Sequence, residues 1–293
     1  MIISIKTIMA FIKKRSMPQI ALKVSILLIG IVCITGCEDV VDIDTPVGTP
    51  TLVVDASFRV YTDEEPVQVD NAIKLSLSAP FFAQDVPAVS NATVYITDQT
   101  DQTRILYTES QVPGTFIPNQ QDQFIPQFNR SYELTVIYND ETYIATANLI
   151  PTVPIDEIKQ GDGNFIDGEE TEIFAVFTDV KDREDYYFFD FGFNEYTVNE
   201  DRFYDGQTFE YPFYYDDLKP NQELNISILG IDEQYFNYAE ILIDQSDPGG
   251  GPFPTPPVNL RGNIKNANKT DLRALGYFHI AQAYRLSYTV VTP

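Results

Sequence analysis

The segment Ser131–Leu149 constrains the fold most, because it predicts two strands and the turn that joins them. Every second side chain in residues 132–138 is apolar or aromatic, as expected for a strand with one buried face. Asn139 and Asp140 tolerate the left-handed backbone of a tight turn, and Thr142–Leu149 returns as a second strand. The sequence therefore predicts an antiparallel hairpin within a mostly β protein.

Short alternating segments continue on the N-terminal side of this hairpin. With polar turns between them, residues 51–150 match a small Ig-like antiparallel β-sandwich. Ile150–Ile155 contains two prolines, which lack the N–H that a ladder needs, so we place a domain boundary there.

Residues 155–293 are predicted as a second β-rich domain with one short helix. The helix is expected over Asp232–Ile243, where two acidic residues begin a run with apolar side chains at helical spacing. The expected strands are Thr171–Thr178, Tyr186–Val198, Gln207–Tyr215, Glu223–Ile231, Gly276–Ile280 and Tyr284–Val291.

Residues 1–36 differ in kind from the rest of the chain. They begin with a basic, acid-free stretch and continue with a short apolar run from Ser25 to Ile34, the order of a secretory signal peptide. The run is about half of the roughly 20 residues that a membrane-spanning helix needs. We therefore expect residues 1–36 to be a cleaved leader.

The leader ends in Ile34-Thr35-Gly36-Cys37, which resembles the bacterial lipobox. That resemblance implies a diacylglyceryl group on the Cys37 sulfur and cleavage before this residue. The alternative is a free cysteine near an ordinary cleavage site. Residues 37–50, which are acidic and contain proline and glycine, are expected to form a tether.

Charge and cysteine content exclude several classes of protein. The leader would remove five of the 19 basic residues and none of the 43 acidic ones, leaving a formal charge of −29. Such a body repels nucleic acid and anionic headgroups. Cys33 would leave with the leader and Cys37 would be lipidated, so thiolate metal sites and cysteine nucleophiles are excluded.

Several segments in order resemble the Bacteroidetes lipoprotein family of unknown function DUF4249. They include Leu52-Val-Val-Asp-Ala56, Tyr132-Glu-Leu-Thr-Val136, Asp201-Arg-Phe-Tyr-Asp-Gly206 and Ala274-Leu-Gly-Tyr-Phe278. The resemblance implies a first domain similar to transthyretin-like or carboxypeptidase-regulatory-like sandwiches and a β-rich second domain. It also implies a TonB-dependent outer-membrane transporter as a frequent gene neighbour, and so a β-barrel partner. It implies no catalytic residues.

Catalysis has little support in the sequence. A base for a serine nucleophile would have to be His279, the one histidine. Alternation around this residue predicts a half-exposed strand position. Pairs of carboxylates are so numerous among 43 acidic residues that no pair is informative.

Calcium is the ion that the sequence favours, although no cofactor other than the lipid on Cys37 is expected. Asp162, Asn164 and Asp167 resemble part of a calcium loop, but Ile166 and Asp167 occupy the places of a ligand and a glycine in the EF-hand pattern. A second oxygen-rich stretch contains Asp179, Asp182 and Asp185.

Aromatic residues crowd residues 203–215, where alternation assigns about half of them to the core. The others could form a sugar- or peptide-binding face or a protein interface, since tyrosine is enriched at interfaces. The candidate interface residues are Tyr204, Tyr211, Tyr214 and Tyr215.

Together these features predict a non-enzymatic lipoprotein of the outer membrane that docks to, or captures ligand for, a TonB-dependent transporter. The alternatives are a structural or adhesion lipoprotein and a carboxylate- or calcium-dependent hydrolase. Glu38 and Asp39, directly after the lipidated cysteine, resemble surface-export signals of Bacteroidetes lipoproteins and favour the cell surface over the periplasm.

Overall fold

Alternating apolar positions form strands through most of the chain. The computed structural model describes residues 48–80, 83, 85–119, 124–161, 170–216, 218–246 and 260–291. The strands of the first half are β1 (Leu52–Tyr61), β2 (Gln68–Asp70), β3 (Ile73–Leu77), β4 (Thr93–Asp98), β5 (Arg104–Glu109), β6 (Thr115–Pro118), β7 (Ser131–Tyr138) and β8 (Glu141–Ile150).

The second half contains the remaining strands and two helices. The strands are β9 (Ile155–Gln160), β10 (Thr171–Thr178), β11 (Tyr186–Asp190), β12 (Tyr196–Glu200), β13 (Thr208–Tyr215), β14 (Glu223–Ile231), β15 (Lys265–Asn266) and β16 (Leu275–Thr289). The 3₁₀ helix η1 spans Asp201–Phe203 and the α-helix α2 spans Glu233–Ser246. Within the described ranges, no helix has the length and apolar content that a membrane span requires.

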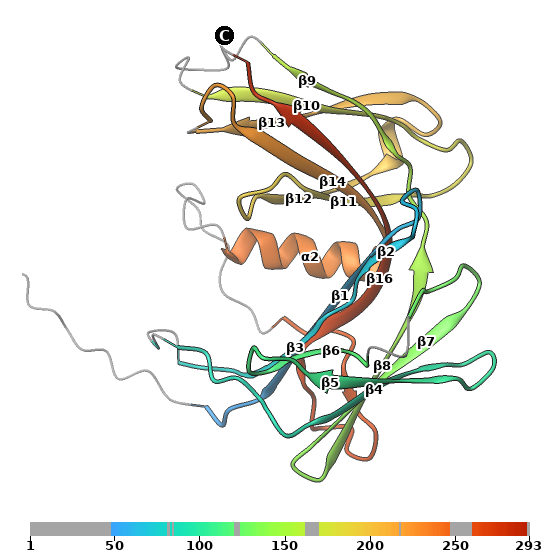
Figure 1. Cartoon of the computed structure of the whole chain (residues 1–293), viewed down its shortest axis with the longest axis vertical. Helices are drawn as coiled ribbons and strands as arrows, with labels where there is room; N and C mark the ends of the chain where they lie inside the picture. The colour runs from blue at the N-terminus through green and yellow to red at the C-terminus, as the bar shows by residue number, and fades with distance from the viewer. Residues whose placement is uncertain are drawn as a thin grey trace, which may run out of the picture. The chain divides into compact units, whose positions relative to one another are not determined.

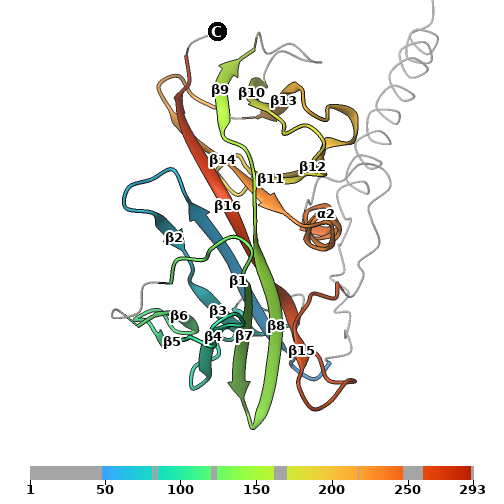
Figure 2. The same ribbon diagram turned by 90° about the vertical axis from the view of Figure 1, so that its right-hand side faces the viewer.

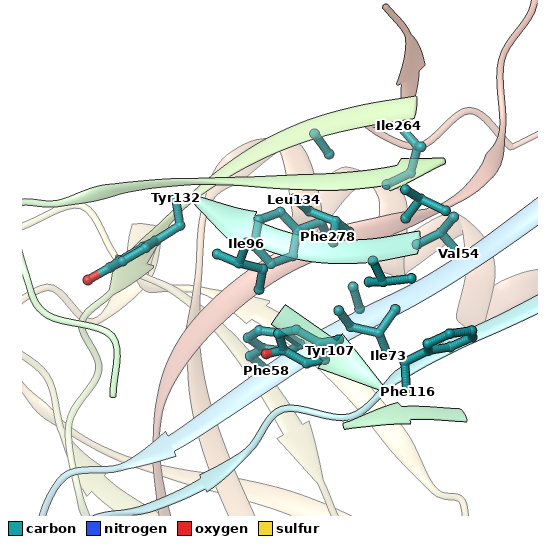
Figure 3. Packing of buried hydrophobic residues seen from close by; sticks show 14 of the residues in the cluster. Val54, Phe58, Ile73, Ile96, Tyr107, Phe116, Tyr132, Leu134, Ile264 and Phe278 are labelled. Carbon is teal, nitrogen blue, oxygen red and sulfur yellow. The ribbon is translucent and has the colours of Figure 1, made fainter. Parts of the chain in front are cut away.

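The first half forms a closed ring of strands. The hydrogen-bonded order is β1-β3-β6-β5-β4-β7-β8, and β16 pairs with both β1 and β8 to complete the circle. Both of these closing pairings are parallel. Side chains of alternate residues point inward, including the fully buried Phe58, Ile96 and Phe278 (Figure 3).

The second half is two stacked sheets. The sheet β13-β10-β9 packs against β11, β14 and the C-terminal part of β16. The core between them is rich in aromatic rings: Phe191 stacks on Phe213 with ring centroids 4.3 Å apart, and Phe189 stacks on Tyr211 at 5.0 Å. Such pairs add to the stabilisation from burial alone.

Strand β16 belongs to both halves. Its residues 275–283 pair with β1, and residues 283–289 pair with β14. Figures 1 and 2 show this strand, in red, running from the ring into the stacked sheets. The ring is thus completed by the last strand of the chain.

Helix α2 covers one side of the sheet near this junction. It begins after Asp232, whose Oδ1 accepts the backbone N–H of Tyr235 at 2.7 Å and so caps the first turn. Tyr235 and Ala239 are its buried residues. They pack in one cluster with Tyr277 of β16 and Ile231 of β14.

The prediction of a mostly β protein with one helix is confirmed for the described residues. The core of the first half draws residues from both sides of the boundary predicted at Ile150–Ile155, because Ile264, Phe278 and Ile280 belong to it. Residues 48–293 form one contact unit rather than the two successive domains 51–150 and 155–293. The first half is a closed ring instead of a sandwich, because its closing strand comes from the other end of the chain.

Candidate functional site

A cleft of about 360 Å³ lies where the outer face of the ring meets the second half and α2. Successive side chains of a strand point to opposite faces, so β1 sends Val54, Ala56 and Phe58 into the ring core and Asp55, Ser57 and Arg59 into the cleft. The other residues that line the cleft are Asp70, Ala72, Lys74, Phe188, Tyr196, Leu229, Tyr235 and His279.

Arg59 links the two halves within this cleft. Its Nη1 donates to Oδ2 of Asp190 in β11 at 2.6 Å, and both side chains are mostly buried. Burial favours the neutral guanidine, but the charges and hydrogen bonds of Asp190 and Tyr61 together outweigh it and raise the pKa of Arg59. The guanidinium therefore stays charged in a partly dry site.

His279 lies on the wall of the cleft, stacked on Tyr235 with the ring centroids 3.8 Å apart. It is only 6 % exposed, and its Nδ1 has no hydrogen-bond partner among the described residues. Burial, followed by the charge of Arg59, lowers its pKa to about 3. The imidazole is therefore neutral near pH 7.

The prediction that His279 is half-exposed is wrong. Alternation along β16 is as expected, since Phe278 and Ile280 enter the ring core. The opposite face is also covered, because Tyr235 of α2 packs on it. The apolar stripe of the helix indicates that it covers part of a sheet, but the sequence does not show which strand it covers.

Ser57 and His279 are neighbours in the parallel register of β1 and β16, which is the residue pair that a hydrolase would need. No hydrogen bond joins these two described side chains; the Ser57 hydroxyl instead interacts with Tyr235. An imidazole with a pKa of about 3 is also a weak base at neutral pH. This geometry gives no support for proton abstraction from Ser57 by His279.

A cluster of carboxylates lies in the second half. Oxygen atoms of Asp179, Asp201 and Asp205 lie within 4.8 Å of one another, and the first two residues are buried. Carboxylate oxygens are the ligands that calcium and magnesium prefer, so these three residues could hold such an ion. The aspartates sit in the turn after β10 and in the segment around η1.

The calcium ligands predicted from the sequence do not all lie in this cluster. Of the second oxygen-rich stretch, Asp179 belongs to the cluster, whereas Asp182 contributes its backbone N–H to Asp205 Oδ1 at 2.8 Å. Asp185 instead accepts hydrogen bonds from Arg183, at 2.6 and 2.9 Å. Asp162, Asn164 and Asp167 lie outside the described residues, and so does Cys37.

Two of the four tyrosines predicted at an interface are core residues. Tyr204 and Tyr215 are 5 % and 6 % exposed, because their rings pack between the two sheets of the second half. Tyr211 is half-buried, with its hydroxyl 3.0 Å from that of Thr197. Tyr214 is on the other face of β13 and donates to Glu172 at 2.8 Å. The prediction is therefore wrong for Tyr204 and Tyr215.

The fold and the cleft define a β protein with two cores and a partly polar cleft at their junction. The chain belongs to the family described as "Domain of unknown function (DUF4249)", which matches residues 38–287 and confirms the resemblance seen in the sequence. None of the curated proteins matches the sequence.

Among solved structures, the chain is similar to the FN1–FN3 domains of chicken CNTN1. The two are 13 % identical with a TM-score of 0.20, and the match covers 63 % of this chain. It spans 61 % of the length of that structure.

Proposed function

We propose that this chain is a non-enzymatic lipoprotein, anchored to the outer membrane through Cys37, that captures a small ligand for a TonB-dependent transporter. The observation that carries the proposal is the cleft at the junction of the two halves. Charged side chains of the ring face, including Asp55 and Arg59, meet the aromatic side chains Tyr196 and Tyr235 there. Small-molecule sites commonly combine apolar walls with a few convergent polar groups.

The anchor accounts for the location. Each buried methylene of a lipid chain contributes roughly 0.8 kcal/mol, so two or three acyl chains on Cys37 hold the protein at the membrane. The acidic residues 37–50, expected from the sequence to form a tether, would link this anchor to the body. Exposure at the cell surface, as the acidic Glu38 and Asp39 favour, would be tested by protease treatment of intact cells.

Co-purification tests the partnership. The full chain, carrying a C-terminal affinity tag, is purified from outer membranes solubilised in detergent, and the transporter is expected to elute with it. The matched control is Cys37→Ser, which should leave the membrane fraction because it cannot be lipidated. Recovery of the lipidated chain with no transporter would refute the proposal.

Hydrolysis is the second candidate, since Asp55 and Asp70 both line the cleft and acidic pairs serve glycosidases. Asp55 lies 3.7 Å from the Lys74 ammonium, and both side chains are more than half exposed. A proton-donating acid needs a drier setting. Release of nitrophenol from neutral nitrophenyl glycosides that is lost in Asp55→Asn and in Asp70→Asn would establish hydrolysis; no release would exclude it for these substrates.

A further inference from the structure

The ligand class can be read from the cleft, on the premise of the proposed function that the cleft captures a small molecule. Its two cations are paired within the protein, and among the described residues Asp70 is left as a carboxylate without an ion pair. Arg59 is paired with Asp190 at 2.6 Å, and Lys74 lies 3.7 Å from Asp55. An anionic ligand would have to compete with Asp190 or Asp55 for its cation. A neutral ligand would not, and could still use the remaining lone pairs and N–H groups.

The deepest polar group on the wall is also neutral. His279 is 94 % buried, and its Nδ1 has no hydrogen-bond partner among the described residues. A buried polar atom without a partner is costly unless something satisfies it. Nδ1 is shielded from solvent, so a ligand in the cleft does not contact this atom and meets the stacked rings of His279 and Tyr235 as part of the wall.

Donors and acceptors alternate along the floor of the cleft. Asp55, Ser57 and Arg59 follow one another on the outer face of β1, and the register pairs Arg59 with Asp70 across the strands. Carboxylates accept from hydroxyls and guanidinium donates to them, often in pairs. A ligand with several adjacent hydroxyls matches this row better than one with a single polar group.

Aromatic side chains form the opposite wall. Phe188 and Tyr196 are half-buried, with ring centroids 5.6 Å apart, and both line the cleft. Their faces suit a ligand that also has an apolar side. The volume of about 360 Å³ lies near the lower end of the range of small-molecule sites, about 300–1,000 Å³.

We infer that the cleft binds a neutral saccharide of one or two sugar units, with Arg59 and Asp70 hydrogen-bonded to its hydroxyls and Tyr196 packing on its C–H face. A ring of hydroxyls over an apolar face matches the row of polar side chains and the aromatic wall together.

The test uses the full lipidated chain in a detergent without a sugar headgroup. Saturation-transfer difference NMR is recorded with glucose, galactose, mannose, maltose and cellobiose, and with glucosamine, glucuronate and the dipeptide Ala-Tyr as charged counterparts. At least one neutral sugar is expected to give a signal, and the charged counterparts to give weaker ones. No signal from any neutral sugar, or a stronger signal from a charged compound, overturns the inference.

Variants locate the binding. Arg59→Gln removes hydrogen bonds from a charged donor and should weaken binding about tenfold or more. Tyr196→Ala serves the same purpose through the aromatic wall and keeps the test open if Arg59→Gln does not fold. Arg285→Gln is the matched control, because Arg285 also pairs with a carboxylate, that of Glu64 at 2.7 Å, but does not line the cleft.

The failure of this inference can be separated from failure of the proposed function. If the transporter co-purifies and no neutral sugar binds, the saccharide inference fails alone. If a sugar binds in a way that Arg59→Gln abolishes but no transporter is recovered, the saccharide inference stands and the transporter partnership fails. Equal loss of binding in Arg59→Gln and Arg285→Gln would show that the sugar does not bind in the cleft.

Discussion

The two halves of the molecule hold buried carboxylates in opposite electrostatic settings. In the first half, Arg130 donates to Asp98 at 2.7 Å and to Asp101 at 2.8 Å. Burial alone would raise the pKa of Asp98, but hydrogen bonds from Arg130 and Thr100 outweigh it and lower the pKa. Hydrogen bonds from Thr103 and Arg130 lower the pKa of Asp101 to about 2.

In the second half, the buried Asp179, Asp185 and Asp201 lie close together, and Arg183 pairs with Asp185. Burial raises the pKa of Asp201, and the charges of Asp179 and Asp185 add to the increase. Burial also raises the pKa of Asp185, although Arg183 opposes the shift. Asp98 and Asp101, which with Arg130 form the first cluster, therefore stabilise the fold when they are ionised. Ionisation of Asp185 and Asp201 instead costs stability.

Ionised carboxylates thus have opposite effects on stability in the two halves. The halves share β16, and if this strand couples them they unfold in one transition. The ionised aspartates of the second half then lower the unfolding free energy of the whole protein. The aromatic core of the second half offsets part of this cost. Four substitutions and a pH series test this account.

The largest effect is expected for Phe278→Ala on the shared strand. Phe278 is fully buried and its ring lies 5.5 Å from that of Phe58, so truncation should cost about 3–5 kcal/mol of unfolding free energy. Both halves should unfold in one transition. Denaturant unfolding followed by tyrosine fluorescence and by circular dichroism measures this, with the exposed Leu286→Ala on the same strand as control. Two separate transitions would show that β16 does not couple the halves.

Asp98→Asn should give the next largest loss. The substitution removes the charge that pairs with Arg130 in a site where Asp98 is 5 % exposed, at a cost of about 1–2 kcal/mol at pH 7. Thermal unfolding at pH 7 measures it. An unchanged melting temperature would mean that Arg130 does not stabilise the first cluster.

Asp201→Asn should act in the opposite direction. The asparagine oxygen can still accept the backbone N–H of Asp185, now at 3.1 Å from the carboxylate, while one of three crowded negative charges is removed. We expect a gain of about 0.5–1 kcal/mol at pH 7. A loss of stability in the same thermal assay would contradict the contrast between the clusters.

The pH at which each effect disappears sharpens the comparison. A carboxylate whose pKa is raised by folding costs stability when ionised, so the advantage of Asp201→Asn should fade as pH falls through that raised pKa, above the ordinary value of about 3.9. A carboxylate with a lowered pKa contributes stability that is lost only below about 3.9, so the cost of Asp98→Asn should persist to lower pH. Melting temperatures of both variants between pH 3 and 8 test this order.

Lys74→Ala should have the smallest effect. Lys74 and Asp55 are 68 % and 52 % exposed and 3.7 Å apart, so their pair should contribute less than about 0.5 kcal/mol. A loss well above this value would show that the outer face of the ring depends on its ion pairs.

Local features could be predicted from the sequence, and non-local ones could not. The hairpin at residues 131–149 is present as β7 and β8, with Asn139 and Asp140 both at positive φ as the turn requires. The strand expected over Glu223–Ile231 is β14, and the helix begins one residue after its predicted start.

The ring closure depends on β16 pairing with β1 in parallel, more than 200 residues apart in sequence, and neither segment specifies its partner by its own pattern. The cleft follows from that closure. Alternation along β1 accounts for Asp55, Ser57 and Arg59, but the rest of the lining comes from β2, β3, β11, β12, β14, α2 and β16, which no sequence spacing connects. Asp201 and Asp205 were missed as neighbours of Asp179 for the same reason.

Hydrogen–deuterium exchange on the full lipidated chain tests the central claim, that the junction cleft is where the ligand binds. It is recorded with and without a neutral saccharide that gives a signal in the NMR assay. The account predicts slower exchange in peptides that cover β1, β12, α2 and the part of β16 that contains His279. Slower exchange only in β4–β7, or no change in any peptide at a saturating sugar concentration, would contradict it.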